Sequence, residues 1–284
     1  MIEMLPQYIT LNEDRFCEFL EGQTHPAKFK INGGIWVVRY IKNLQKYPRH
    51  NLRLASEFVG YRISQKLGVP APESKIVRVG ESFKKRYFGH QKNEEIEVRA
   101  GLATASKWLE NALCPDIEKG RLDKFWEEDY YLEIVAHVRT ADTWIMNFDR
   151  RKRGNVLLTG PLQSPHVWFL DFDQSFLAKE KCPIHGFRLH WSEEAFRREW
   201  LDDTEVLSGF DGTGDIRCES VQRFVHFKNV LVKLKNINDE ELKEVLEEIP
   251  FEWNISKKAR QQWLENFLHR RDVTIRNIEN RYPR

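Results

Sequence analysis

Three oxygen-bearing side chains in the middle of the chain have the types and the spacing of a magnesium–nucleotide site. Asp149 is followed, after a short basic loop, by Asn155, and Asp171 comes sixteen residues after Asn155. An amide oxygen and a carboxylate can share one Mg²⁺ ion, whose ligands sit about 2.0–2.1 Å from the metal. A further aspartate beside them can orient and deprotonate an attacking hydroxyl. This set of groups indicates phosphoryl transfer.

An antiparallel hairpin is the element that must bring Asn155 and Asp171 together. Two apolar segments flank the sequence Gly-Pro-Leu-Gln-Ser-Pro at residues 160–165, which predicts a chain reversal. Centring the reversal on Gln163 places Asn155 opposite Asp171, with Cβ atoms about 4.5–5.5 Å apart. A register shifted by one residue would separate the two side chains. Each residue alone also fits a turn or a strand end, whereas the ordered set favours a metal–nucleotide site.

The first hundred residues have the pattern of strands with one helix. A hairpin is predicted from strands at 27–31 and 35–40, and the glycines at 33–34 would supply the positive φ of its turn. Apolar residues at helical spacing predict a helix over 52–67. A further strand is predicted over 74–79.

From about Ala105 the pattern becomes helical, and the hairpin described above interrupts it. Helices are expected over residues 121–145, 219–234, 239–248 and 256–280. The chain is therefore predicted to be an α+β protein with two lobes. The N-lobe (1–105) would hold a small mixed sheet and one helix, and the C-lobe (106–284) would be mainly helical. A cleft between two lobes is a usual place for a ligand.

Composition narrows the classes of function. The chain has 284 residues, of which 41% are hydrophobic and 31% charged, and these values are typical of a globular protein. No apolar run approaches the 18 residues of a membrane span, and no secretory signal is expected. Four widely spaced cysteines predict no disulfide framework, which favours a reducing, cytoplasmic setting. The net charge of +2 does not favour binding to nucleic acid.

The order of these motifs resembles that of the HipA-like kinases, bacterial relatives of the phosphatidylinositol and protein kinases, and most closely their compact stand-alone branch. The resemblance covers roughly residues 5–278. Its specificity lies in the order and spacing of the motifs and not in any one of them. In chain order they are Trp36-Val37-Val38-Arg39, Ser56-Glu57-Phe58, Leu67-Gly68-Val69-Pro70-Ala71-Pro72, Asn147-Phe148-Asp149-Arg150, Asn155 and Leu170-Asp171-Phe172-Asp173.

The resemblance implies a two-lobed protein-kinase-like fold and a role for each matched residue in the C-lobe. Asp149 would be the catalytic aspartate, and Arg150 would belong to the same catalytic loop. Asn155 and Asp171 would hold Mg²⁺. Asp142, seven residues before Asp149, would brace the loop by hydrogen bonds.

The phosphate-binding residues implied by the resemblance include one departure from the family pattern. Glu57 would pair with the basic residue that reaches the ATP phosphates, and Arg39 stands where the family has lysine. Arginine is always charged and can bind phosphate through two N–H groups. Lys42 could substitute for it, although strand alternation aims Lys42 at the other face. Arg53 closes the basic segment that starts at Lys42, and this segment could contact phosphates.

The resemblance implies an ATP- and Mg²⁺-dependent kinase that phosphorylates serine or threonine in a protein substrate. The alternative is a pseudokinase that binds nucleotide and acts as an interaction module without turnover. Two departures keep it open: Arg39 replaces lysine, and six residues separate Asp149 from Asn155 where five is commoner. The sequence identifies neither the acceptor protein nor a partner antitoxin or another regulatory protein.

Overall fold

The structure is a computed structural model, and the description covers most of the chain. The described residues are 8–20, 26–40, 50–83, 86–88, 95–114, 129–145, 147, 155–161, 164–172 and 224–281.

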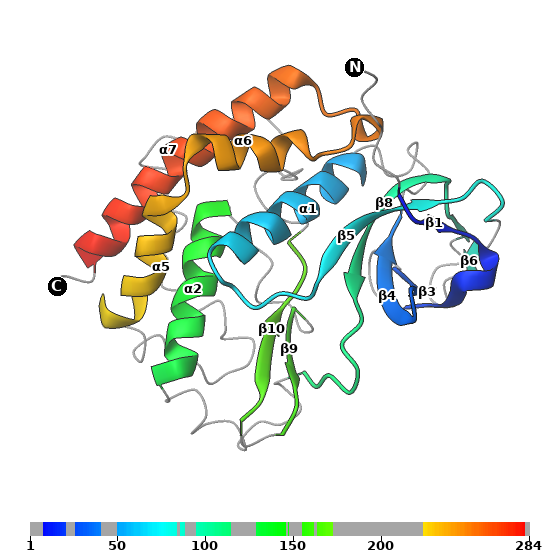
Figure 1. The fold of residues 1–284 in the computed structure, drawn as a ribbon, viewed down its shortest axis with the longest axis horizontal. Helices are drawn as coiled ribbons and strands as arrows, with labels where there is room; N and C mark the ends of the chain where they lie inside the picture. The colour runs from blue at the N-terminus through cyan, green and yellow to red at the C-terminus, as the bar shows by residue number, and fades with distance from the viewer. Residues whose placement is uncertain are drawn as a thin grey trace.

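A six-stranded sheet forms the N-terminal part of the molecule (Figure 1). The strand order is β1-β5-β8-β4-β3-β2, and the sheet is mixed because β1 runs parallel to β5 while the other neighbours are antiparallel. Two short strands, β6 and β7, pair separately. The strands are β1 (Thr10–Leu11), β2 (Phe16–Phe19), β3 (Ala27–Ile31), β4 (Gly34–Arg39), β5 (Ser74–Val79), β6 (Arg86–Phe88), β7 (Glu95–Glu97) and β8 (Gly101–Lys107), and the 3₁₀ helix η1 (Glu13–Arg15) precedes β2.

The predicted first hairpin is present as β3 and β4, but its turn is one residue shorter than expected. Ile31 pairs with Gly34, so the turn residues are Asn32 and Gly33, with φ of 49° and 80°. A two-residue hairpin turn of this type needs positive φ at both positions, and asparagine tolerates the left-handed region better than most residues. Gly34 is therefore the first residue of β4 and not part of the turn.

The strand β8 was not among the predicted strands, and it runs two residues past Ala105, where the helical part of the chain was expected to begin. This strand lies in the middle of the sheet, between β5 and β4. Its segment Leu102-Ala103-Thr104-Ala105 contains residues that favour a helix, and alanine does so most strongly. All four are buried, and backbone pairing on both edges outweighs this local preference.

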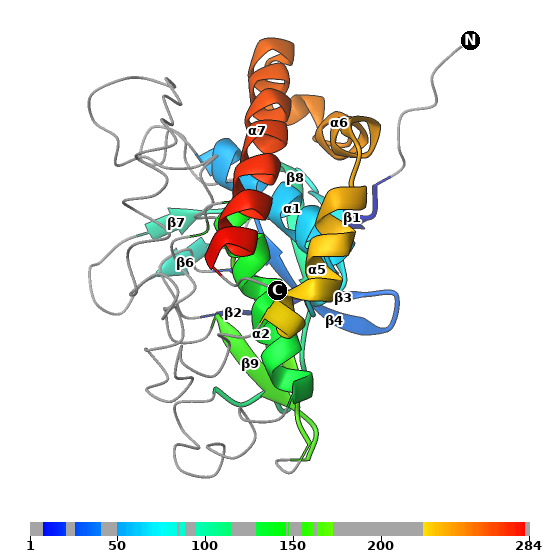
Figure 2. The same cartoon turned by 90° about the vertical axis from the view of Figure 1, so that its left-hand side faces the viewer.

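The predicted helices and the second hairpin are present within the described residues. Residues 121–128 and 219–223, where two of the helices were expected to begin, lie outside the description. Figure 2 shows α2, α5 and α7 side by side. The elements are α1 (His50–Lys66), α2 (Asp129–Ile145), β9 (Val156–Thr159), β10 (His166–Phe169), α5 (Phe224–Asn236), α6 (Asp239–Glu247), the 3₁₀ helix η6 (Phe251–Trp253) and α7 (Lys257–Arg281).

Two clusters of buried hydrophobic side chains hold the fold together. The smaller cluster consists largely of side chains from the strands of the six-stranded sheet, such as Phe29, Trp36 and Val38. The larger cluster joins α1 to α2, to the hairpin β9–β10 and to the three C-terminal helices, through residues such as Trp144 and Trp263. The helix of the N-terminal half therefore shares its core with the C-terminal half.

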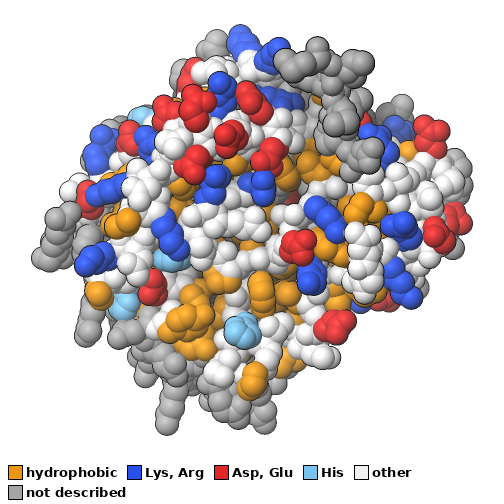
Figure 3. Space-filling model, viewed as in Figure 1, with side chains coloured by type: hydrophobic (Ala, Val, Ile, Leu, Met, Phe, Trp, Pro, Cys, Tyr) orange, Lys and Arg blue, Asp and Glu red, His pale blue; other side chains and the backbone are white. Residues whose placement is uncertain are grey.

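The outer surface is polar over much of the face in Figure 3, where charged side chains of both signs alternate with apolar ones. Within the described part of the chain, no helix combines the length and the apolar character needed to cross a membrane.

Candidate active site

The hairpin β9–β10 has a register one residue away from the predicted one. Val156 pairs with Phe169 and Leu158 pairs with Val167, and these four side chains are all buried. The predicted register would have set Val167 and Phe169 opposite residues that are only partly buried. Because directly opposed residues share a face of the sheet, the observed register gathers the apolar side chains on the core side.

Asn155 and Asp171 lie at the open end of this hairpin in spite of the shifted register. The Leu170 N–H donates to the Asn155 carbonyl at 2.9 Å, so the backbone of Asn155 meets the residue directly before Asp171. Asp171 itself follows the strand and has φ of 58°, which is a left-handed conformation. Such a conformation is uncommon for a residue other than glycine and is frequent at functional sites. Strict strand alternation therefore no longer determines the direction of the Asp171 side chain.

An ion cluster joins the sheet, α1 and the end of the hairpin. Arg39 Nη1 lies 2.8 Å from Glu57 Oε2 and 2.9 Å from Asp171 Oδ1. The side chain of Glu57 is only 4% exposed, whereas those of Arg39 and Asp171 are 18% and 22% exposed. The predicted pairing of Glu57 with Arg39 is thus present, and Asp171 is a second partner that the sequence did not suggest. We call these three residues the ion triad.

The charges of the ion triad suit a bound cation. One guanidinium and two carboxylates leave a net charge of −1, at a place where Asp171 is still partly open to solvent. Among the described residues, no group of three His, Cys, Asp or Glu side chains could hold a metal ion. A magnesium ion here would therefore depend on Asp171, on the amide of Asn155 and on oxygens from the nucleotide and water, a ligand set that Mg²⁺ accepts.

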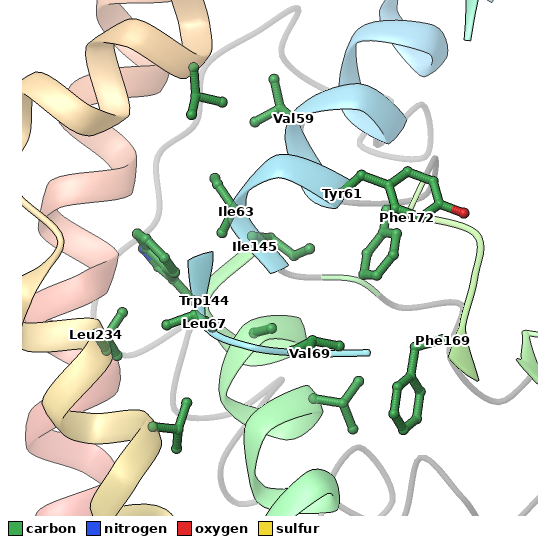
Figure 4. Close-up of a cluster of buried hydrophobic side chains, with 14 of the residues drawn as sticks. Val59, Tyr61, Ile63, Leu67, Val69, Trp144, Ile145, Phe169, Phe172 and Leu234 are labelled. Atoms are coloured by element: carbon green, nitrogen blue, oxygen red, sulfur yellow. The ribbon is translucent and has the colours of Figure 1, made fainter. Parts of the chain in front are cut away.

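Two aromatic side chains fix the segment after β10 against α1. Tyr61 and Phe172 lie side by side in Figure 4. Their ring centroids are 4.8 Å apart, with an interplanar angle of 65°. Burial raises the pKa of the Tyr61 phenol above its ordinary value, the charges of Glu57 and Asp171 add to this rise, and Arg39 opposes it. The phenol therefore remains protonated beside the ion triad.

A hydrogen-bond bridge ties the end of α2 to the same segment. The Asn147 side-chain amide donates to Asp142 Oδ1 at 3.1 Å and to the Asp171 carbonyl at 3.4 Å, and the Asn147 N–H donates to the Asp142 carbonyl at 3.0 Å. These hydrogen bonds to Asn147 are the physical basis of the bracing role predicted for Asp142. Asn147, which stands two residues before Asp149 in the sequence, is thereby held next to Asp171.

Three of the predicted site residues lie outside the described residues: Lys42, Asp149 and Arg150. Arg53 is described and lies on α1, one helical turn before Glu57, with its side chain partly buried. The structure thus brings together Arg39, Glu57, Asn155 and Asp171.

Gly60 is a site residue that the sequence analysis missed. A Cβ atom at this position would lie 2.5 Å from the Cβ and 3.1 Å from the Cγ of Phe172. The Cβ of Phe172 cannot swing away as the end of a side chain could, so α1 approaches this segment closely only because residue 60 is glycine. The available signal was a glycine within a helical pattern, which costs about 1 kcal/mol relative to alanine and commonly has a packing reason.

We expect Gly60→Ala to weaken the site, although alanine favours helices. The added methyl must push Phe172 and its neighbour Asp171 away from α1, and overpacking of this kind costs about 1–3 kcal/mol. We expect a lower melting temperature, which scanning calorimetry measures.

Ser64→Ala is the matched control for this substitution. Ser64 is buried on the same helix, one turn further on, and its change to alanine adds no atom. An unchanged melting temperature in Gly60→Ala would contradict the positioning role of Gly60.

The sheet, the buried glutamate on its helix and the aspartate after the hairpin define the class of the protein: an α+β chain with the two-lobed fold of a kinase. A sequence profile of the HipA-like kinases matches residues 21–210, well over half of the chain, and the chain belongs to this family. A Helicobacter pylori proinflammatory kinase, CtkA, has a similar crystal structure. The TM-score is 0.53 at 13% sequence identity, covering 96% of this chain and 99% of that one, and the likeness is one of fold. No curated protein sequence matches significantly.

Proposed function

We propose that this kinase-family chain is an ATP- and Mg²⁺-dependent phosphotransferase that phosphorylates serine or threonine hydroxyls of a protein substrate. The observation that carries the proposal is the ion triad. A strand residue, a buried helix glutamate and the aspartate after the hairpin converge within 2.8–2.9 Å, and their net negative charge favours a divalent cation.

In this proposal each residue of the site has a separate task. Magnesium-bound ATP would supply the transferable phosphoryl group, and Asn155 and Asp171 would hold the metal. Arg39 would contact the phosphates, oriented by Glu57. Asp149 would accept the proton of the acceptor hydroxyl. The other basic residues named above, Arg150, Lys42 and Arg53, would contact the phosphates or the loop around them.

The buried position of Glu57 supports the proposed task of Arg39. A carboxylate with 4% exposure needs a charged partner, since an unpaired buried charge costs several kcal/mol. Arg39 is thereby held against α1 while the same nitrogen also reaches Asp171. A guanidinium can bind phosphate oxygens through two of its N–H groups.

The test is transfer of the γ-phosphate of ATP to protein, measured with and without Mg²⁺. We expect wild-type turnover that requires the metal, and at least a 100-fold lower rate for Asp149→Ala, because general-base groups contribute roughly 10²–10⁴-fold. Identification of phosphorylated residues by mass spectrometry tests the serine/threonine assignment. Equal background rates for the wild type and Asp149→Ala would contradict the catalytic proposal.

A pseudokinase is the second candidate, and the contact between Arg39 and Asp171 favours it. An arginine bound to the carboxylate that should hold the metal competes with that metal. In this case Mg²⁺-ATP raises the melting temperature without any phosphate transfer. Arg39→Lys should then restore transfer, and no gain in that variant would rule out Arg39 as the cause.

A further inference from the structure

The segment formed by residues 238–254 returns from the C-terminal helices to the N-terminal half. It consists of α6, a short link and η6, and we call it the strap. In Figure 1 it runs beside α1 towards the sheet, and α6 contacts α1 while η6 contacts both α1 and β8. The strap therefore lies against the helix that carries Glu57.

Trp253 anchors the end of the strap. Its side chain is 1% exposed, and its Nε1–H donates to the Leu102 carbonyl of β8 at 3.0 Å. Its ring meets Phe58 edge to face, with centroids 6.3 Å apart and an interplanar angle of 72°. Phe58 directly follows Glu57 in α1. One side chain thus connects the strap to both the sheet and the residue next to the buried glutamate.

Three ion pairs continue this contact along the outer surface. Each joins an acidic residue of the strap to a basic residue of α1 or β5, and Figure 3 shows acidic side chains gathered over α6 with basic ones beside them. Exposed pairs contribute little singly, but three in a row favour one placement of the strap along the helix. The pairs are Glu241–Lys66 at 3.4 Å, Glu248–Arg62 at 2.7 Å and Glu252–Arg78 at 2.6 Å.

The strap has a well-defined structure of its own. Asn238 and Glu241 form a capping box at the start of α6, in which each side chain accepts from the other residue's backbone N–H. At the other end Asn254, with φ of 56°, terminates η6. Arg260 of α7 donates to the Leu246 carbonyl at 3.0 Å. Because hydrogen bonds fix both ends of the strap, a shift of the strap would also shift α1.

We propose that the strap fixes the position of α1 and that Trp253 is a positioning residue, which acts through Phe58 on Glu57 and so on Arg39. This inference rests on the proposed function, in which Arg39 contacts the phosphates. On one side, α1 packs through Gly60 against Phe172, in the segment after β10. The strap contacts α1 on another side. The Glu57–Arg39 pair is then in place before a nucleotide binds.

The first experiment compares wild type with Trp253→Leu and Trp253→Phe by hydrogen exchange and by kinetics. In Trp253→Leu we expect amide exchange over residues 54–60 to become about 10-fold faster, because local opening of α1 becomes easier, with exchange in α7 unchanged. We expect the KM for Mg²⁺-ATP to rise roughly 10-fold with a smaller change in kcat, because Arg39 is displaced. Trp253→Phe keeps a ring against Phe58 and should restore most of the KM.

A second variant keeps the core intact. The double substitution Glu248→Lys and Glu252→Lys turns two of the ion pairs into repulsions and leaves the capping box of α6 intact, and it should raise the KM about 3- to 10-fold. The matched control is Glu244→Lys and Glu247→Lys, which changes the charge of the strap by the same amount at exposed positions. We expect the control to have the wild-type KM and wild-type exchange in α1.

The outcomes separate this inference from the proposed function. If the wild type neither binds nor turns over Mg²⁺-ATP, the proposed function fails, and exchange in α1 still decides whether the strap fixes the helix. If the wild type is active while Trp253→Leu and the double variant keep its KM and its exchange, the role of the strap is overturned. An equal effect of the double variant and its control would also overturn it.

Discussion

Asp171→Asn should reduce phosphate transfer by about 100-fold or more, since even residues that only support metal ligands contribute roughly 10–100-fold. The substitution removes the only carboxylate that the proposal gives to the metal and leaves an amide in its place. It also removes one of the two anionic partners of Arg39. Asparagine is the suitable replacement because it tolerates the left-handed backbone of residue 171, so the fold should persist.

The direct measurement is the Mg²⁺ concentration that half-saturates the rise in melting temperature caused by ATP. We expect that concentration to increase about 10-fold or more in Asp171→Asn. Asp272→Asn serves as the control, because that residue lies exposed on α7. An unchanged magnesium requirement in Asp171→Asn would remove Asp171 from the proposed metal site, whatever happens to the rate.

Arg270→Met should lower the free energy of unfolding by about 3 kcal/mol, because buried acceptors left without a donor cost roughly 1–3 kcal/mol each. Arg270 of α7 is fully buried and donates to the carbonyls of Thr143 and Trp144 in the last turn of α2. Carbonyls in that turn have no partner within the helix, and a cation near a helix C-terminus is favourable. Burial also lowers the pKa of Arg270.

Urea denaturation of the variant and of wild type measures this difference. Methionine has a similar length and no charge, so the comparison isolates the hydrogen bonds and the charge from the loss of volume. Arg276→Met on the exposed side of α7 is the control and should change stability little. A variant as stable as wild type would mean that the cost of burying the guanidinium equals what its hydrogen bonds contribute.

Much of the local structure could be predicted from the sequence because its signals are local. The strand at residues 74–79 and the final helices depend on apolar periodicity and on turn residues nearby. The predicted register of β9–β10 was wrong by one residue, because the turn was assumed to be centred on Gln163. The alternation of Val156, Leu158, Val167 and Phe169 already pointed to the observed pairing, since these residues must share the buried face.

Other features depend on partners distant along the chain. The alanines of β8 favour a helix locally, and only β4 and β5 on either side make a strand there. The contact of Arg39 with Asp171 joins residues 132 positions apart, and that of Trp253 with Leu102 joins residues 151 positions apart. The family resemblance identified Arg39, Glu57, Asn155 and Asp171 as candidates and implied the pairing of Glu57 with Arg39, but nothing in the sequence indicated the contact of Arg39 with Asp171.

The shared core of α1 and the C-terminal helices has a consequence for how the molecule holds together. The N-terminal half leaves one wall of its helix to be covered by residues such as Trp144 and Leu234. Without these residues, the N-terminal half would expose the apolar face of α1 to water. We therefore expect that neither lobe folds independently of the other. Loss of buried side chains from the C-terminal helices should therefore loosen α1 and Glu57, and denaturation should proceed as one cooperative event.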